Sequence, residues 1–306
     1  MEYKFEKYID CQQGAVRSVR FSVDGAYCVT CGSNRRIKLW NPYKGTHLKT
    51  YSGHGDEVMD AQASCDSSQI VSCGLDKSVI VWDVATGTPV RRFRGHSGAV
   101  MTVRYNEEST MAISGSRDNS VMCWDTRSRA QDPAQTLNDA KDTISSIRVS
   151  DYEILTGSFD CRIRKYDIRN GELVADYLGA IVTCASFTRD GQCILVSCAD
   201  GVIRLIDKDT GELLGEFLGL PPTNLCLESS VDSNDTRILS GSSDGKLWIW
   251  DLATQNVVAK LSGDKPTKHA TVSISVHPQK NCFLAANGMN ILMWETETET
   301  ETETNA

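Results

Sequence analysis

Residues 95–125, GHSGAVMTVRYNEESTMAISGSRDNSVMCWD, decide the fold of this chain because their pattern returns along most of the sequence. Three runs within them, VMTVRYN, MAISGS and SVMCWD, alternate apolar and polar residues and are separated by turn residues. Such alternation predicts half-buried β-strands, and no stretch of the chain shows a convincing helical period. A short run after a loop, PAQTL (133–137), completes a predicted four-stranded unit.

Seven units of this kind align along the chain. Each ends at an anchor residue, and successive anchors lie 42, 42, 42, 40, 44 and 44 residues apart: Trp40, Trp82, Trp124, Tyr166, Ile206, Trp250 and Trp294. A turn residue lies six positions before each anchor: Asn34, Asp76, Asp118, Asp160, Asp200, Asp244 and Gly288. One four-stranded unit cannot bury both of its faces, whereas seven units stacked around an axis can.

The period, the Trp-Asp anchors and two Gly-His pairs, at His54 and His96, resemble the WD40 repeat family. A period of about 40–45 residues with these marks is typical of four-stranded propeller blades. The resemblance covers about residues 5–295. It implies an all-β, seven-bladed WD40 β-propeller, which we assign to residues 1–295.

The ends of the chain carry two further expectations. The seventh unit stops at its third strand near Trp294, while FEKYID (5–10) aligns 42 residues before the outer strand HLKTYS (47–52). We expect residues 5–10 to complete the last blade as its fourth strand and to close the ring, because a closed ring protects the strand edges. Residues 296–306 alternate Glu with Thr, have no apolar residues to bury beyond a final alanine, and are expected to form a disordered acidic tail.

Composition narrows the functional classes. The net charge is −8, and leaving out the five alternating glutamates from Glu295 to Glu303 gives 35 acidic residues against 32 basic ones. This balance does not favour a nucleic-acid-binding protein, although direct RNA contact stays open. No apolar run approaches the roughly 20 residues of a membrane span, and residues 1–14 lack the apolar core of a signal peptide. We therefore expect no membrane contact.

The twelve cysteines include one CxxC pair, Cys28 and Cys31. Residues i and i+3 of a strand point to opposite faces, and no second CxxC or His pair accompanies this one. We expect small buried strand residues and no metal site. Reduced thiols fit a protein of the cytoplasm and nucleus.

Two polar sets repeat at identical spacing: His54, Ser72, Asp76 and Trp82, then His96, Ser114, Asp118 and Trp124. A Ser–His–Asp combination also occurs in hydrolases. One active site needs only one copy, and the WD40 resemblance implies a hydrogen-bonded chain inside each blade. We expect these sets to be structural and the chain to have no catalytic residues and no cofactor.

The residue just before each turn position should face one side of a propeller. In three adjacent blades it is Leu75, Arg117 and Phe159, where small polar residues would suffice. Arg and aromatic residues are enriched in interfaces, so this cluster, with Glu57 and Lys141 at its rim, is a candidate partner-binding surface. The alternative is that these side chains only cover neighbouring loops.

A second candidate surface rests on WDTR (124–127) and YDIR (166–169). They resemble the WDxR boxes through which substrate receptors of cullin-4 ubiquitin ligases dock on their adaptor, which would assign that role to Arg127 and Arg169. Tyr166 departs from the motif by replacing its Trp.

Several stretches, among them AVRSVRFSVDGAYCVTCGS (15–33) and LIDKDTGELLGEF (205–217), are similar to a subgroup of WD40 scaffold proteins. This resemblance implies a non-enzymatic scaffold that organises the mitogen-activated protein kinase cascade upstream of the extracellular-signal-regulated kinases, or that accompanies spliceosomes. The expected partners are proteins of these assemblies rather than a small-molecule substrate. We expect a monomeric propeller that acts within larger complexes.

Overall fold

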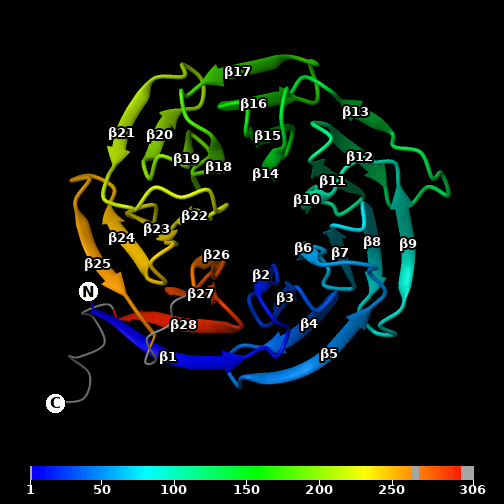
Figure 1. Cartoon of the computed structure of the whole chain (residues 1–306), viewed down its shortest axis with the longest axis horizontal. Coiled ribbons are helices and arrows are strands. Elements are labelled where there is room, and N and C mark those ends of the chain that lie inside the picture. The colour runs from blue at the N-terminus through cyan, green and yellow to red at the C-terminus, as the bar shows by residue number, and fades with distance from the viewer. Residues whose placement is uncertain (1, 264–268, 298–306) are drawn as a thin grey trace.

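The computed structural model describes residues 2–263 and 269–297 and contains seven four-stranded antiparallel sheets around a central axis (Figure 1). The innermost strands line a channel along this axis, which holds two cavities. The predicted all-β class and the seven blades are confirmed, and the described residues contain no helix. In each blade the first strand lies nearest the channel and the fourth lies at the rim.

The strands follow one another blade by blade. Blades one to three are β2 (Val16–Phe21), β3 (Cys28–Gly32), β4 (Arg36–Asn41), β5 (Thr46–Ser52); β6 (Val58–Ala63), β7 (Gln69–Gly74), β8 (Ser78–Asp83), β9 (Pro89–Arg94); β10 (Val100–Tyr105), β11 (Met111–Ser116), β12 (Val121–Asp125) and β13 (Gln135–Leu137). Blades four and five are β14 (Ile144–Val149), β15 (Glu153–Ser158), β16 (Arg162–Asp167), β17 (Leu173–Tyr177); β18 (Val182–Phe187), β19 (Cys193–Cys198), β20 (Ile203–Asp207) and β21 (Leu213–Phe217). Blades six and seven are β22 (Ser229–Val231), β23 (Arg237–Gly241), β24 (Leu247–Asp251), β25 (Val257–Leu261); β26 (Thr271–Val276), β27 (Cys282–Asn287), β28 (Asn290–Glu297) and β1 (Glu2–Asp10).

The core consists of apolar layers between neighbouring blades. Val71 and Phe93 of blade two, for example, pack with Val100 and Trp124 of blade three. Trp82, Trp124 and Trp250 are among the largest fully buried side chains. Burying an aromatic side chain of this size stabilises the folded state by about 2–3 kcal/mol, so the anchor positions hold the blades together.

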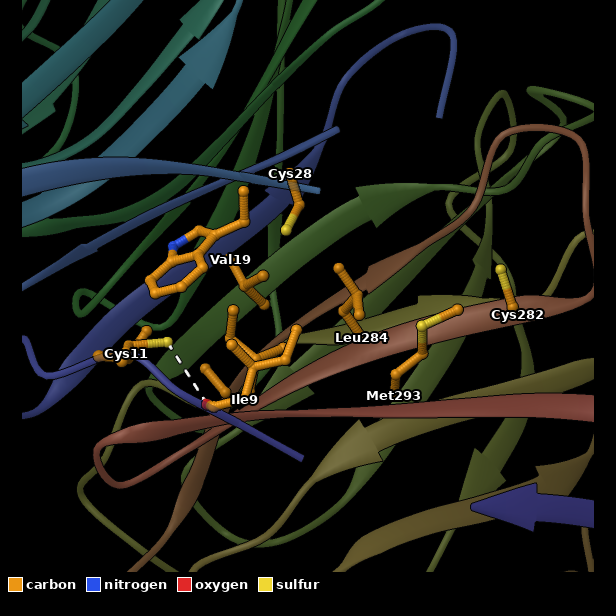
Figure 2. Close-up of a cluster of buried hydrophobic side chains, with 11 residues drawn as sticks. Ile9, Cys11, Val19, Cys28, Cys282, Leu284 and Met293 are labelled. Carbon is orange, nitrogen blue, oxygen red and sulfur yellow. Dashed lines mark hydrogen bonds between the residues drawn. The ribbon is translucent and has the colours of Figure 1, made fainter. Parts of the chain in front are cut away.

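The ring closes through β1, as predicted. β1 pairs with β28 in antiparallel register, with Phe5 opposite Trp294 and Ile9 opposite Ile291. Figure 2 shows Ile9 and Cys11 packed with Leu284 and Met293 of blade seven and with residues of blade one. The strand begins at Glu2, earlier than the predicted residue 5.

The predicted boundary of the tail was two residues too early. Thr296 and Glu297 belong to β28, where they pair with Tyr3 and Glu2. The longer β1 provides hydrogen-bonding partners that repeat alignment did not show. Residues 298–306, the rest of the predicted disordered tail, lie outside the described residues.

Cys28 and Cys31 point into different layers, as the strand geometry predicted. Cys28 packs with Trp40 beside blade seven, and Cys31 packs with Ile37 beside blade two. Burial raises the pKa of both thiols well above the usual range. All twelve cysteines lie in the described part of the chain, and all are free thiols.

Candidate interaction surfaces

The two repeated polar sets form hydrogen-bonded chains inside blades two and three. In blade two Trp82 Nε1 donates to Ser72 Oγ at 2.8 Å, and His54 Nε2 lies 2.8 Å from the same oxygen. His54 Nδ1 lies 3.0 Å from Asp76 Oδ2. A neutral ring that donates from Nδ1 satisfies every donor, because Ser72 can then donate to Nε2.

Blade three repeats this geometry. Trp124 Nε1 donates to Ser114 Oγ at 2.8 Å, and His96 Nε2 lies 2.8 Å from the same oxygen. His96 Nδ1 lies 2.9 Å from Asp118 Oδ2. Burial lowers the pKa of His96, which keeps the ring neutral. Burial also acts to raise the pKa of Asp118, but hydrogen bonds from Ser120 and the interaction with His96 outweigh this effect and hold the pKa at about 2. Ser72 and Ser114 are 0% exposed, so no substrate can reach either hydroxyl.

Other blades satisfy their buried groups differently, which sequence comparison with blades two and three did not reveal. Trp40 Nε1 donates to Thr30 Oγ1 at 2.8 Å, and Thr30 donates to Gln13, which replaces the histidine. In blade four Arg164 lies 2.6 Å from the turn carboxylate of Asp160. The common requirement is a partner for each buried polar group, and several residue types meet it.

The structure brings the five predicted partner-binding residues to one face. Leu75, Arg117 and Phe159 lie in the turns between the second and third strands of blades two, three and four. The amide of Leu75 donates to Glu57 O at 2.9 Å. Lys141 lies in the loop before β14, and its amide donates to the Asp160 carboxylate of the β15–β16 turn at 2.9 Å.

Their exposure differs from the prediction of an open cluster. Arg117 and Lys141 are exposed, whereas Leu75 and Phe159 are half-buried. No ion pair or side-chain hydrogen bond joins the Arg117 guanidinium to another described residue. The anchor of this face is therefore Arg117, with smaller apolar areas on either side.

Arg117 also lines a cavity of about 240 Å³ at this mouth of the channel. Met59 and Met101 enter the cavity from the innermost strands, and Leu225 enters from the loop before β22. Arg17 borders it as well and donates to Glu57 at 2.8 Å. The result is a hollow that combines flexible apolar side chains with an unpaired cation.

Arg127 and Arg169 lie on the opposite face, after the third strands of their blades. Their side chains are 72% and 60% exposed. The guanidinium carbon of Arg169 lies 3.5 Å from the centre of the Tyr152 ring, and Asp167 accepts a hydrogen bond at 3.4 Å. Arg127 is thus accessible and loosely held, while Arg169 is already stacked within its own blade.

A charged network that the repeat pattern did not predict lies in the centre of the channel. Arg20, Arg104 and Arg148, from β2, β10 and β14, surround the carboxylates of Asp60 and Glu228. Arg20 donates to Glu228 at 2.6 Å, and Arg148 donates to it at 3.5 Å. A signal was present, since the three arginines recur at one register of the innermost strand, 84 and 44 residues apart.

The network keeps its charges in spite of burial. Burial acts to raise the pKa of Glu228, but Arg20 and Arg148 hold it far below its usual range. Burial likewise acts to raise the pKa of Asp60, but the charges of Arg104 and Arg20 outweigh burial, and the pKa is lowered. The pKa of Arg104 falls to about 10 because the residue is buried, so it stays protonated at neutral pH. Three cations against two anions leave a surplus of one positive charge.

Within residues 2–263 and 269–297, no group of three or more His, Cys, Asp or Glu side chains is placed to hold a metal ion. The same residues contain no helix that is long and apolar enough to cross a membrane.

Comparisons with known proteins agree with this geometry. The family profile "WD domain, G-beta repeat" matches residues 4–41, 45–83, 87–125, 171–207 and 224–251. WD repeat domain-containing protein 83 of Rattus norvegicus is 58% identical over 291 residues, which is 95% of this chain and 91% of that protein. The human protein of the same name is 56% identical over 292 residues, which is again 95% of this chain and 91% of that protein. A WD repeat domain-containing protein 83 homolog of Dictyostelium discoideum is 32% identical and covers 94% of this chain and 97% of its own length. The chain belongs to the WD40 repeat family.

Proposed function

We propose that this chain is a non-enzymatic scaffold that docks protein partners on the face that carries Arg117. One observation carries the proposal: an exposed arginine without a described partner stands at a hollow channel mouth, between half-buried Leu75 and Phe159. Arginine and aromatic residues dominate binding hot spots, and an unpaired guanidinium gains most from a carboxylate of the partner.

The shape of the surface suggests the chemistry of the partner segment. Met59 and Met101 offer flexible apolar surface beside Arg117, and methionine adapts to irregular side chains. A segment with one acidic and one apolar anchor would fit. Exposed Lys141 at the rim would steer such a segment more than it would add affinity.

The finer identity of the partners rests on resemblance. Similarity to WD40 scaffolds supports components of the mitogen-activated protein kinase cascade, spliceosomal proteins, or both, in cytoplasm and nucleus. The non-enzymatic role is supported by Ser72 and Ser114, whose hydroxyls are buried inside the blades. The net charge of −8 gives no support to RNA as the main partner.

The test is a triple variant, Leu75→Ser, Arg117→Ala and Phe159→Ala, used to capture named kinase-cascade and spliceosomal proteins from cell extract. Anchors of this kind contribute roughly 2 kcal/mol each, so capture should fall at least 30-fold. The matched control changes the same turn position in other blades, with Ser33→Ala and Ser243→Ala. Undiminished capture by a triple variant with a normal thermal melt would contradict this docking face.

A second candidate is a substrate receptor for a cullin-4 ubiquitin ligase. The observation in its favour is the accessible Arg127 on the opposite face. Under this alternative Arg127→Ala with Arg169→Ala abolishes capture of the ligase adaptor, and the triple variant does not. Absence of adaptor binding by the unmodified chain would exclude it.

A further inference from the structure

The channel mouth opposite Arg117 has the features of an anion site. We propose that it binds a small molecule with two or more phosphate groups, independently of the protein docking described above. A cavity of about 290 Å³ lies there, bordered by Arg20, Arg104, Arg148 and Arg189. No carboxylate is among the described residues that line it.

The two acids of the network lie on the other side of the arginines. Asp60 and Glu228 border the cavity at the Arg117 mouth and do not border this one. The three network arginines border both cavities and form the partition between them. A ligand in the opposite mouth therefore meets guanidinium groups directly, while the carboxylates lie behind them.

Repetition of the fold gives the three guanidinium groups the same orientation. In each case Nη1 donates to the carbonyl of the preceding residue: Arg20 to Val19 at 3.0 Å, Arg104 to Val103 at 2.6 Å and Arg148 to Ile147 at 3.1 Å. Because β2, β10 and β14 surround one axis, equivalent orientations converge. Backbone carbonyls fix the positions of the cations without neutralising them.

The network also leaves donors unused. The Arg20 side chain is only 12% exposed, and its buried Nε has no hydrogen-bond partner among the described residues. Arg148 makes only a 3.5 Å contact with Glu228 beyond its carbonyl bond. Arg148 therefore has donors available for an acceptor in this cavity.

Arg189 completes the site from a different strand connection. It lies in the β18–β19 turn, and its guanidinium donates to the carbonyls of His277 and Pro278 at 3.0 and 3.1 Å. It forms no ion pair with any described carboxylate. Together with the three network arginines, it places four guanidinium groups on the lining of this cavity.

This arrangement favours phosphate over other ligands. Guanidinium groups bind phosphate oxygens in pairs of parallel hydrogen bonds, and several arginines can share one polyanion. A cation would be repelled, and a single carboxylate has too few oxygens to pair with four guanidinium groups at once. The site lies within a ring of innermost strands, which favours a small molecule over a macromolecule.

The test measures binding of tripolyphosphate to the full chain by calorimetry and by thermal shift, at constant ionic strength. We expect saturable binding with a raised melting temperature, and no comparable effect of sodium sulfate. Arg148→Gln and Arg189→Gln, which remove the two least buried ligating cations, should each weaken binding at least tenfold. Arg17→Gln, at the other mouth, is the matched control and should bind as the unmodified chain does.

Three outcomes would overturn the proposal. One is the absence of saturable tripolyphosphate binding by the folded chain. Another is binding that survives both Arg148→Gln and Arg189→Gln, or that Arg17→Gln abolishes. The third is binding of a phosphorylated peptide at this mouth when tripolyphosphate does not bind, which would make the ligand a protein. Arg189→Gln alone suffices if Arg148→Gln does not fold.

Discussion

Replacing Glu228 with glutamine tests whether the channel network stabilises the propeller. The substitution keeps the size and shape of the side chain and removes its charge. Arg20, Arg104 and Arg148 would then share the single carboxylate of Asp60, and the local excess would rise by one positive charge. We expect a folded but less stable chain.

The contacts of Glu228 set the magnitude. Its carboxylate accepts from Arg20 Nη1 at 2.6 Å, from Ser273 Oγ at 2.6 Å and from Ile274 N at 3.2 Å. These three hydrogen bonds all end on Oε2, while Arg20 Nη2 and Arg148 Nη2 donate to Oε1. The new amide NH₂ group must therefore face arginine donors at one position or the other and lose those hydrogen bonds. Removing one member of a buried ionic network costs about 3–5 kcal/mol, because the remaining charges stay buried without compensation.

The assay is a thermal melt at neutral pH, followed by circular dichroism. A loss of about 3 kcal/mol or more should lower the melting temperature by about 6 °C or more. Glu57→Gln is the matched control, because it removes a partly exposed ion pair with Arg17. Such a pair contributes at most about 1 kcal/mol. Equal melting temperatures for Glu228→Gln and Glu57→Gln would refute the stabilising role of the network.

Three other predictions follow from the blades and their closure. Removing residues 2–10 takes away β1 and its core side chains, so the melting temperature should fall by many degrees, and an unchanged melt would contradict ring closure. Trp82→Ala should cost roughly 3–5 kcal/mol in urea unfolding, and a variant that is fully stable would show that this anchor is not structural. The pKa of Asp118 is about 2 in the folded state and 3.8 ordinarily, so its ionised form stabilises the fold above about pH 4 and this contribution is lost as pH falls toward 2. The stability difference between the unmodified chain and Asp118→Asn, about 2 kcal/mol at neutral pH, should therefore shrink over that range, and a difference that is independent of pH would contradict the assignment.

The fold could be predicted from local features that recur. Apolar alternation, turn residues and anchors such as Trp82 and Trp124 each act within one blade, so seven aligned copies predict seven blades. Closure by residues 5–10 was predictable for the same reason, because the missing strand left a gap in the repeat. The hydrogen-bonded chains of His54 and His96 were predictable because their members share one blade.

The channel network needed the tertiary structure. Arg20 and Glu228 lie 208 residues apart, and Glu228 reaches the channel from the loop before β22 rather than from a regular strand position. Exposure also depended on packing, which half-buries Leu75 and Phe159 and leaves Arg117 open. The sequence by itself therefore determined the blades, their number and their closure, because these depend on patterns within about 42 residues. Only the tertiary structure decided which charges meet in the channel and which residues face solvent, because closing the ring brings residues from different blades around one axis.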